Sequence, residues 1–318
     1  MHFRLNRWLL ILILVIMTGI SAVICTAAGP AGIPLFGGMD ADMASLILTE
    51  IRLPRVIAAL LVGAGLAAAG TAMQGLFKNP LADPYVIGTS SGAALGAAIS
   101  FIFLNGVMHP YLAFSGACLA TTVVYLAGQR NGRIPVETLL LAGIAVSLFC
   151  SAMLSFLIYN AGEDLHMIMF WLMGGFSNTG WDNVMTGLLI VPGICAFVIL
   201  AREIDILSLG EEEASTLGVN TDRIKIILLG ISAFITGIAV SIAGTIGFIG
   251  LITPHIIRTI TGPGHRFLLP TVVLTGGLIL LWADTASRTF FNDMPVGIIT
   301  ACLGAPFFMY LIRRRTRI

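Results

Sequence analysis

Long, nearly uncharged runs of apolar residues constrain the fold of this 318-residue chain more than any other feature. Hydrophobic residues make up 57% of the sequence and charged residues only 10%, against about 25% charged in ordinary soluble domains. One soluble core cannot bury so much apolar surface, so we expect a polytopic membrane protein. The runs are also too continuous for the alternating, roughly ten-residue strands of a membrane β-barrel, so the spans are predicted to be helices.

A membrane-spanning helix needs about 20 apolar residues, with a range near 17–25. We predict ten spans, of which the eighth, Gly247–Ile260, is short and flanked by glycine. The expected fold is therefore all-α, a single transmembrane domain covering residues 1–318 with ten spans. The apolar Leu165–Phe176 stretch is shorter and is interpreted as a helix lying in or partly entering the outer interface. The ten spans are predicted at Trp8–Ala28, Val56–Leu76, Val86–Leu104, Tyr111–Gln129, Val136–Tyr159, Asn183–Ala201, Ile224–Thr245, Gly247–Ile260, Phe267–Ala286 and Val296–Ile312.

The basic residues predict the orientation of the chain. With both termini inside, only Arg52, Arg55 and Arg288 fall in outer segments, and the other 14 basic residues fall in inner segments. Cytoplasmic segments carry the excess of lysine and arginine, so we expect an even number of spans with both termini cytoplasmic. The inner residues are Arg4, Arg7, Lys78, Arg130, Arg133, Arg202, Arg223, Lys225, Arg258, Arg266, Arg313, Arg314, Arg315 and Arg317.

Several kinds of chemistry lack the residues that they need. Lys78 and Lys225 are the only lysines, and neither follows the glycine pattern of a phosphate-binding loop, so any ATP that drives this protein must be hydrolysed by another subunit. The five cysteines lie in apolar runs without a Cys-x-x-Cys pair or a histidine at ligand spacing, so no metal site, cofactor or catalytic residue is expected. A net charge of +1 gives no indication of nucleic-acid binding.

The longest inner segment, Arg202–Arg223, carries the pattern of a short helix. Ser208 can cap it, three consecutive glutamates from Glu211 suit its first turn, and Gly218 can close it. Glu211–Leu217 is therefore predicted as an amphipathic helix held against the inner membrane face. It is either an ordinary surface helix or a docking helix for a cytosolic partner.

Five motifs, in this order and spacing, resemble the permease subunits of ATP-driven importers for iron chelates and cobalamin, the FecCD-type family. The resemblance extends from about Glu50 to the C-terminus. It implies ten spans per subunit, a second copy around a central path, two cytosolic ATP-binding-cassette ATPase subunits, an extracytoplasmic substrate-binding protein and a place in the lipid of the inner (cytoplasmic) membrane. The motifs are Arg52-Leu-Pro-Arg55, Asn79-Pro-Leu-Ala-Asp-Pro84, Gly210-Glu-Glu-Glu-Ala-Ser-Thr-Leu-Gly218, Gly247-Phe-Ile-Gly-Leu-Ile-Thr-Pro-His-Ile-Ile-Arg258 and Pro295-Val-Gly-Ile-Ile-Thr-Ala-Cys-Leu-Gly-Ala-Pro-Phe-Phe308.

The resemblance also implies roles for three groups of residues. One group resembles the loop whose short helices contact the ATPases, the second resembles a loop that helps to close the inner end of the path, and the third resembles arginines that meet acidic residues of the binding protein. For the arginines, local pairing with Glu50 and Asp284 is the alternative. The groups are Gly210, Glu211, Glu212, Glu213, Ala214, Leu217 and Gly218; Asn79, Pro80 and Leu81; and Arg52, Arg55 and Arg288.

Two other classes of protein compete with an importer permease. An ion-coupled secondary carrier usually keeps ionisable groups near mid-membrane, and the predicted span interiors almost lack them. A membrane protease could use the Gly88-Thr-Ser-Ser-Gly92 pattern with His255, but that pattern needs a strand-to-helix elbow. For the importer, an uncharged path suits a metal chelate, because bare charge would cost several kcal/mol there. The resemblance implies that this chelate is a ferric siderophore or haem. Cobalamin or a molybdate-type oxyanion is the alternative cargo.

Overall fold

A computed structural model describes residues 7–29, 41–130 and 133–315; Arg4 and Arg317, two of the predicted inner residues, lie outside these ranges. Over the described ranges the only β pairing is an isolated bridge between Arg130 and Arg133, which confirms the all-α class. The helices are α1 (Arg7–Ala27), α2 (Ala41–Leu46), α3 (Leu53–Leu76), α4 (Thr89–Leu104), α5 (His109–Gly128), α6 (Val136–Tyr159), α7 (Leu165–Leu172), α8 (Trp181–Leu188), α9 (Ile190–Ile199), α10 (Ala201–Leu209), α11 (Glu211–Thr216), α12 (Thr221–Ala243), α13 (Ile249–Thr261), α14 (His265–Phe290) and α15 (Val296–Arg315), with a π-helical turn η1 (Ile47–Arg52) and 3-10 turns η2 (Pro84–Ile87) and η3 (Gly162–Asp164).

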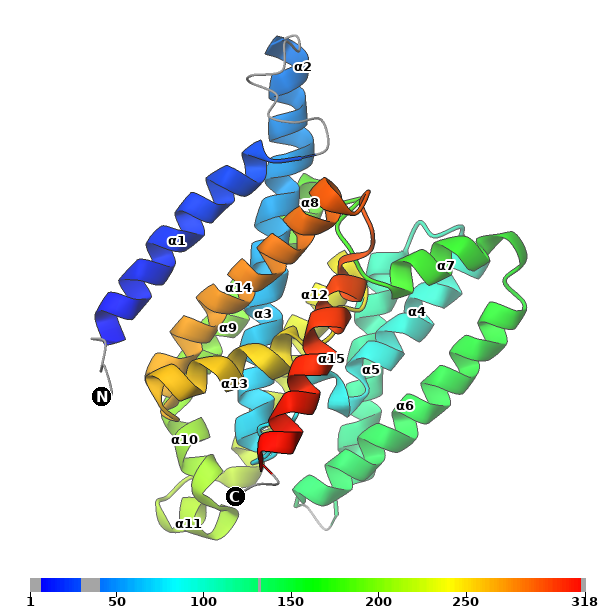
Figure 1. Ribbon diagram of the computed structural model, residues 1–318. Coiled ribbons are helices and arrows are strands. Elements are labelled where there is room, and N and C mark those ends of the chain that lie inside the picture. Colours follow the sequence, from blue (N-terminus) through cyan, green and yellow to red (C-terminus); the bar gives the residue numbers. More distant parts are fainter. Residues whose placement is uncertain (1–6, 30–40, 131–132, 316–318) are drawn as a thin grey trace.

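Helix α3 forms the centre of the bundle and packs against α12, α13 and α14 (Figure 1). Its sequence is rich in glycine and alanine, and nearly all of its residues are buried. Small residues let helix backbones approach closely where lipid provides no hydrophobic drive between helices. The closest approach is at Gly70, where an added Cβ would lie 2.0 Å from the carbonyl oxygen of Gly250 on α13.

The helix that contains α3 begins earlier than the sequence predicts. Instead of starting at Val56, helical structure runs from Ala41 through η1 into α3, so Arg52 and Arg55 lie within a helix rather than in a loop. Pro54 has no N–H, and its ring crowds the carbonyl of the preceding turn. The π-helical turn just before Pro54 widens the backbone and lets the helix continue past it.

Seven helical segments in the described ranges are long and apolar enough to cross a membrane, against the ten predicted. The three that fall short are α4 with 16 residues, α13 with 13 residues and the apolar part of α15. A 16-residue helix is about 24 Å long, less than the roughly 30 Å of a bilayer core. Helix α4 starts late because Pro84–Ile87 form a 3-10 turn and Gly88 has a left-handed φ of 80°.

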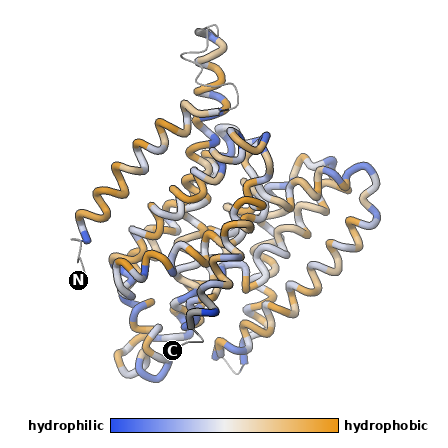
Figure 2. The backbone as a smooth tube through the Cα atoms, in the orientation of Figure 1, coloured by the Kyte–Doolittle hydropathy of each residue, from blue (hydrophilic) through white to orange (hydrophobic). Residues whose placement is uncertain are grey.

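Large apolar faces remain exposed on the outside of the bundle (Figure 2). Helix α6 buries only Leu139, Gly143 and Cys150, and α1 buries only Ser21 and Cys25. In water such faces would aggregate, so lipid or another protein chain must cover them.

The two ends of the bundle carry different elements (Figure 1). Helices α10 and α11 and the C-terminal end of the chain lie at the lower end, which we call the α11 end. Helices α2, α7 and α8 lie at the upper end, which we call the α7 end. Helix α7, at Leu165–Leu172, is the structured part of the short apolar stretch that was predicted as an interfacial helix.

Candidate functional site

The predicted docking helix forms at Glu211–Thr216, one residue shorter than expected. Ser208 does not cap it; this residue lies in α10, and its hydroxyl donates to the carbonyl of Asp205 at 2.6 Å. The cap position is Gly210 with a φ of 155°, and the carboxylate of Glu213 folds back over it, where a Cβ would lie only 1.7 Å away. Glycine is favoured here because other residues rarely adopt a φ of 155°, whereas the carboxylate of Glu213 is the end of a flexible side chain that can move aside.

The end of α11 is closed by Gly218, as the sequence predicts. Gly218 has a φ of 79°, its N–H donates to the carbonyl of Ser215, and the N–H of Val219 donates to the carbonyl of Ala214. This pair of hydrogen bonds is a Schellman motif, which satisfies the last carbonyls of a helix. The helix is anchored by Ala214, which is fully buried, and exposes 60% of Leu217.

The predicted gate loop follows α3 at the same end. Lys78 has a φ of 49°, and the side-chain oxygen of Asn79 accepts the N–H of Leu81 at 3.0 Å, so the loop turns sharply. Lys78 and Pro80 line a cleft of about 420 Å³ between the end of α3, α10 and α13. The structure therefore places this loop beside the segment that carries α11, although the two are more than 120 residues apart in sequence.

Asp83, in the same loop, has an unusual protonation equilibrium. Burial raises the pKa of its carboxyl group to about 6 from the ordinary value of 3.8, although the hydrogen bond from the N–H of Tyr85 at 2.9 Å opposes the shift. A raised pKa means that the folded state favours the protonated acid. The charged carboxylate therefore costs stability above about pH 6, and this cost disappears as the pH falls towards 4.

We predict that Asp83→Asn stabilises the protein at pH 7.5 but not at pH 4. Asparagine keeps the acceptor for Tyr85 and removes the buried charge, and a shift of about two pKa units corresponds to at most about 3 kcal/mol. Thermal unfolding of the purified protein between pH 4 and pH 8 measures the effect. Asp182→Asn on the exposed start of α8 is the matched control, and its unfolding midpoint should stay close to that of the wild type because water solvates both side chains. A constant difference between Asp83→Asn and the wild type across this range would contradict the prediction.

At the α7 end, the structure buries the three arginines for which a docking role is expected. Arg52, Arg55 and Arg288 are each less than 8% exposed. Two of them cap α1: a guanidinium N–H of Arg52 donates to the carbonyl of Ala27 at 2.6 Å, and Arg288 donates to the carbonyl of Cys25. Cations at a helix C-terminus satisfy its free carbonyls and its dipole.

The third arginine belongs to a buried ion-pair network. Arg55 donates through Nε and Nη2 to both oxygens of Asp284 at 2.8–3.0 Å, and Arg288 lies 3.6 Å from the same carboxylate. The carboxylate of Asp293 accepts from Arg55 at 2.6 Å, and although burial opposes it, this hydrogen bond holds the pKa of Asp293 below its ordinary value. The local pairing that was the alternative is present between Arg288 and Asp284, and Arg55 pairs with the same carboxylate. Docking of a binding protein on these arginines stays a prediction.

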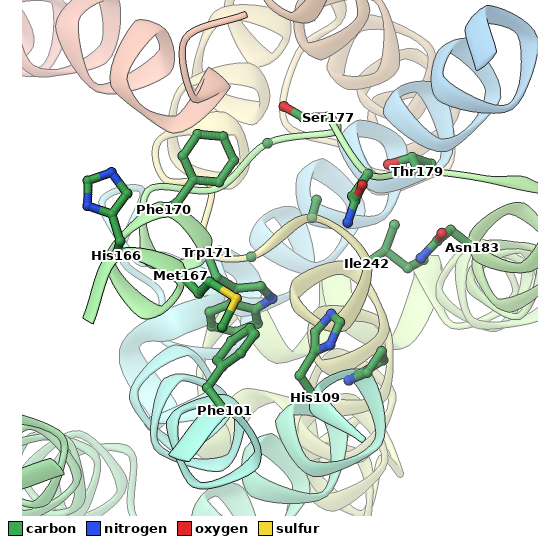
Figure 3. Close-up of a pocket in the computed structure, with 15 residues that line it drawn as sticks. Phe101, His109, His166, Met167, Phe170, Trp171, Ser177, Thr179, Asn183 and Ile242 are labelled. Atoms are coloured by element: carbon green, nitrogen blue, oxygen red, sulfur yellow. The ribbon is translucent and has the colours of Figure 1, made fainter. Parts of the chain in front are cut away.

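A cavity of about 620 Å³ opens at the α7 end among α4, α5, α7, α8 and the end of α12 (Figure 3). Phe101, Met167 and Trp171 lie together on one side of it, and the neutral polar groups of Thr179 and Asn183 lie on the other. Its described lining contains no aspartate, glutamate, lysine or arginine. Such a cavity suits a large ligand whose own charges are shielded.

The serine pattern adopts the start of a helix rather than the elbow of a hydrolase. Helix α4 begins at Thr89 after Gly88, and the hydroxyl of Ser91 donates to the carbonyl of Gly88 at 3.1 Å. In the described ranges no group of histidine, cysteine or acidic side chains could hold a metal ion.

One residue that contacts α11 was not predicted from the sequence. It is Lys225, which is buried near the start of α12. Its spacing of three from Asp222 predicts a local ion pair, and the two groups are 3.8 Å apart. Its stronger contacts, with Glu211 and with the carbonyl of Ile134, carry no signal in the sequence.

The bundle of apolar helices has a capped polar helix at one end and, at the other, a cavity whose described lining lacks aspartate, glutamate, lysine and arginine. Together these features define a multi-pass membrane transport protein. The chain belongs to the FecCD transport family, whose model matches residues 8–314. It is 46% identical over 279 residues to the cobalamin import system permease protein BtuC of Halobacterium salinarum, covering 86% of this chain and 75% of that one. It is 42% identical to the hemin transport system permease protein HmuU of Yersinia pestis, covering 85% of this chain and 84% of that one.

A solved structure supports the same assignment. The chain superposes with a TM-score of 0.85 and 32% identity on an inward-facing ATP-binding-cassette transporter described as of the metal-chelate type, covering 96% of this chain and 98% of that one. The protein is therefore a permease of the ATP-binding-cassette importer class, a transport component of the cell membrane rather than an enzyme.

Proposed function

We propose that two copies of this chain enclose a path for a metal chelate, and that ATP is hydrolysed by two separate cytosolic subunits bound at the α11 end. A substrate-binding protein docks at the α7 end. In this arrangement α4, α13 and α15 also cross the membrane, by tilting or where the bilayer is thinner, which gives ten spans with both termini cytoplasmic.

The observation that carries the proposal is the construction of α11. A six-residue helix is too short to be stable alone, yet here it is closed by a Schellman motif, anchored by Ala214 and connected to α12. It nevertheless exposes Glu212 and most of Leu217 to solvent. A rigid, exposed helix with an apolar end is suited to docking another protein. The gate loop lines a cleft with α10, the helix just before α11, so it can connect the docking surface to the path.

The cargo is a metal chelate whose ligands shield its charge. The cavity at the α7 end offers aromatic, thioether and neutral polar groups, which suit a ferric siderophore or haem. Cobalamin would fit the same description. A molybdate-type oxyanion is less well matched, because the lining lacks the arginine or lysine that would offset the cost of burying its charge. Uptake of labelled chelates, compared between a strain that lacks this gene and the same strain complemented with it, would identify the cargo.

We predict that Glu212→Ala with Leu217→Ala reduces binding of the ATPase subunit at least tenfold and leaves the permease folded. The two changes remove an exposed charge and an exposed apolar contact, and the loss of about 1.4 kcal/mol lowers affinity tenfold. Affinity of the purified ATPase subunit for the permease in nanodiscs is the measurement.

The matched control makes the same two changes at the opposite end of the bundle. Glu163 is exposed beside α7, and Leu165 is 42% exposed, so Glu163→Ala with Leu165→Ala alters an acid and a leucine away from α11. This control should bind the ATPase as the wild type does. If the α11 variant also binds like the wild type, α11 is an ordinary surface helix. Uptake that needs no ATPase subunit and stops when the ion gradient is dissipated would instead identify a secondary carrier.

A further inference from the structure

Lys225 is a fully buried lysine in a protein that has only one other. A buried ammonium group is costly unless it is paired and hydrogen-bonded. Its Nζ lies 2.7 Å from a carboxylate oxygen of Glu211, donates to the carbonyl of Ile134 at 2.7 Å, and lies 3.8 Å from the carboxylate of Asp222. One ammonium group therefore contacts three segments of the chain.

Both backbone polar groups of Ile134 form hydrogen bonds with side chains of α12. Its carbonyl accepts from Lys225, and its N–H donates to the carboxylate of Asp222 at 3.0 Å, so both contacts come from the first turns of α12. Ile134 is itself buried, and the next residue, Pro135, is the cap of α6. The hydroxyl of Thr138 donates to the carbonyls of Gly128 and Pro135, which closes the turn between α5 and α6. The start of α6 is therefore clamped to α12.

Glu211 connects this clamp to α11. It is the first residue of that helix, and its side chain is still 43% exposed although it reaches the buried ammonium. Helix α6 packs on α4 and α5, and the clamp at its start connects this group of helices to α12. A movement of α11 can thus pass through Glu211 and Lys225 to Ile134 and then directly into α6.

We propose that Lys225 is a positioning residue that makes α11 and the start of α6 move as one unit, so that displacement of α11 by a bound ATPase subunit is transmitted to α6. The inference rests on the proposed function for its partner. The link itself consists of the contacts of one ammonium group within this chain, so it can be tested without the ATPase subunit.

The first experiment measures amide hydrogen exchange of the permease alone in nanodiscs. In Glu211→Gln, exchange in α11 should rise about tenfold, as expected for the loss of one charge-assisted hydrogen bond, while the start of α6 keeps its protection. In Lys225→Met, both α11 and residues 134–140 should exchange faster. Glu137→Gln, which changes an exposed glutamate in the first turn of α6, is the matched control with wild-type exchange. Wild-type exchange in both test variants would overturn the link.

The second experiment measures cargo transported per ATP hydrolysed by the assembled transporter. Glu211→Gln removes the ion pair with Lys225, but Glu211 also lies on the helix proposed to contact the ATPase. The ratio is therefore measured at saturating ATPase subunit, so that wild type and variant carry the same amount of it. The ratio of transport to hydrolysis should fall at least threefold, and Glu211→Asp should restore part of it. A merely structural residue would lower the amount of assembled transporter without changing this ratio. An unchanged ratio in Glu211→Gln would refute transmission through Lys225 even where the ATPase binds normally. If the ATPase does not bind the wild type, the proposed function fails, and the exchange measurements still decide the link.

Discussion

Asp284→Asn is expected to prevent the permease from accumulating as a stable membrane protein. Asp284 is fully buried and is shared by two buried arginines, with bidentate hydrogen bonds from Arg55 and an ion pair with Arg288. Asparagine keeps the shape of the side chain but removes the charge that both guanidinium groups need. Removing one partner of a buried ion pair typically costs about 3–5 kcal/mol, because an uncompensated charge stays buried.

Asp293→Asn is the matched control for that prediction. Its carboxylate also accepts from Arg55, at 2.6 Å, but its side chain is 42% exposed. Water can replace such a partner, so the cost should not exceed about 1 kcal/mol. The amount of monodisperse protein extracted from membranes and its midpoint of thermal unfolding measure both variants. Equal stability of Asp284→Asn and Asp293→Asn would show that the buried network contributes nothing beyond a surface pair. Reversing the charge of the arginines would disrupt the same network, so it cannot isolate docking of a binding protein.

Gly70→Ala is expected to separate α3 from α13 and abolish transport. The new Cβ would lie 2.0 Å from the carbonyl oxygen of Gly250, far below any contact that real Cβ atoms make. The obstructing atom is backbone, so no side-chain rotation relieves the clash and the two helices must move apart. Overpacking of this kind costs typically 1–3 kcal/mol, and more where the backbone itself is blocked.

Glycine to alanine at Gly230 should have the opposite effect on the stability of the folded protein. Gly230 lies within α12, and a Cβ there would meet nothing within 4 Å. Alanine favours a helix interior over glycine by roughly 0.5–1 kcal/mol, so Gly230→Ala should be neutral or stabilising. Thermal unfolding and cargo uptake, measured for both variants in the same lipid, test the pair. A Gly70→Ala protein that transports like the wild type would show that α3 and α13 do not need their close approach.

Local features of the fold could be predicted from the sequence because they depend on neighbouring residues. The end of α11 before Gly218 follows from capping chemistry, and its start at Glu211 follows from the three glutamates that suit a first turn; the structure confirms both. The error at Ser208 is also local, since the cap position is Gly210, two residues further along the chain. The predicted span Val86–Leu104 begins before α4 does, because apolar composition does not show where a turn such as Pro84–Ile87 interrupts a helix.

The arrangement of charges could not be predicted, because the partners are distant in sequence. Arg55 precedes Asp284 by 229 residues, and Lys225 follows the carbonyl that it contacts by 91. A count of basic residues groups the three arginines at one end of the helices, but it cannot tell a solvated side chain from a buried one. A backbone carbonyl such as that of Ile134 leaves no pattern in a sequence at all.

The long separation within the buried charge network also has a consequence for biosynthesis. Arg55 and the carbonyls of Cys25 and Ala27 are made early, whereas Asp284 and Arg288 on α14 follow more than 220 residues later. At translation rates of about 5–20 residues per second, the ribosome needs roughly 10–50 s to supply these partners. During that interval Arg55 on α3 lacks both of its acidic partners, Asp284 and Asp293. Synthesis of α14 supplies the first of these carboxylates, so a chain truncated before α14 would leave the charge of Arg55 unpaired.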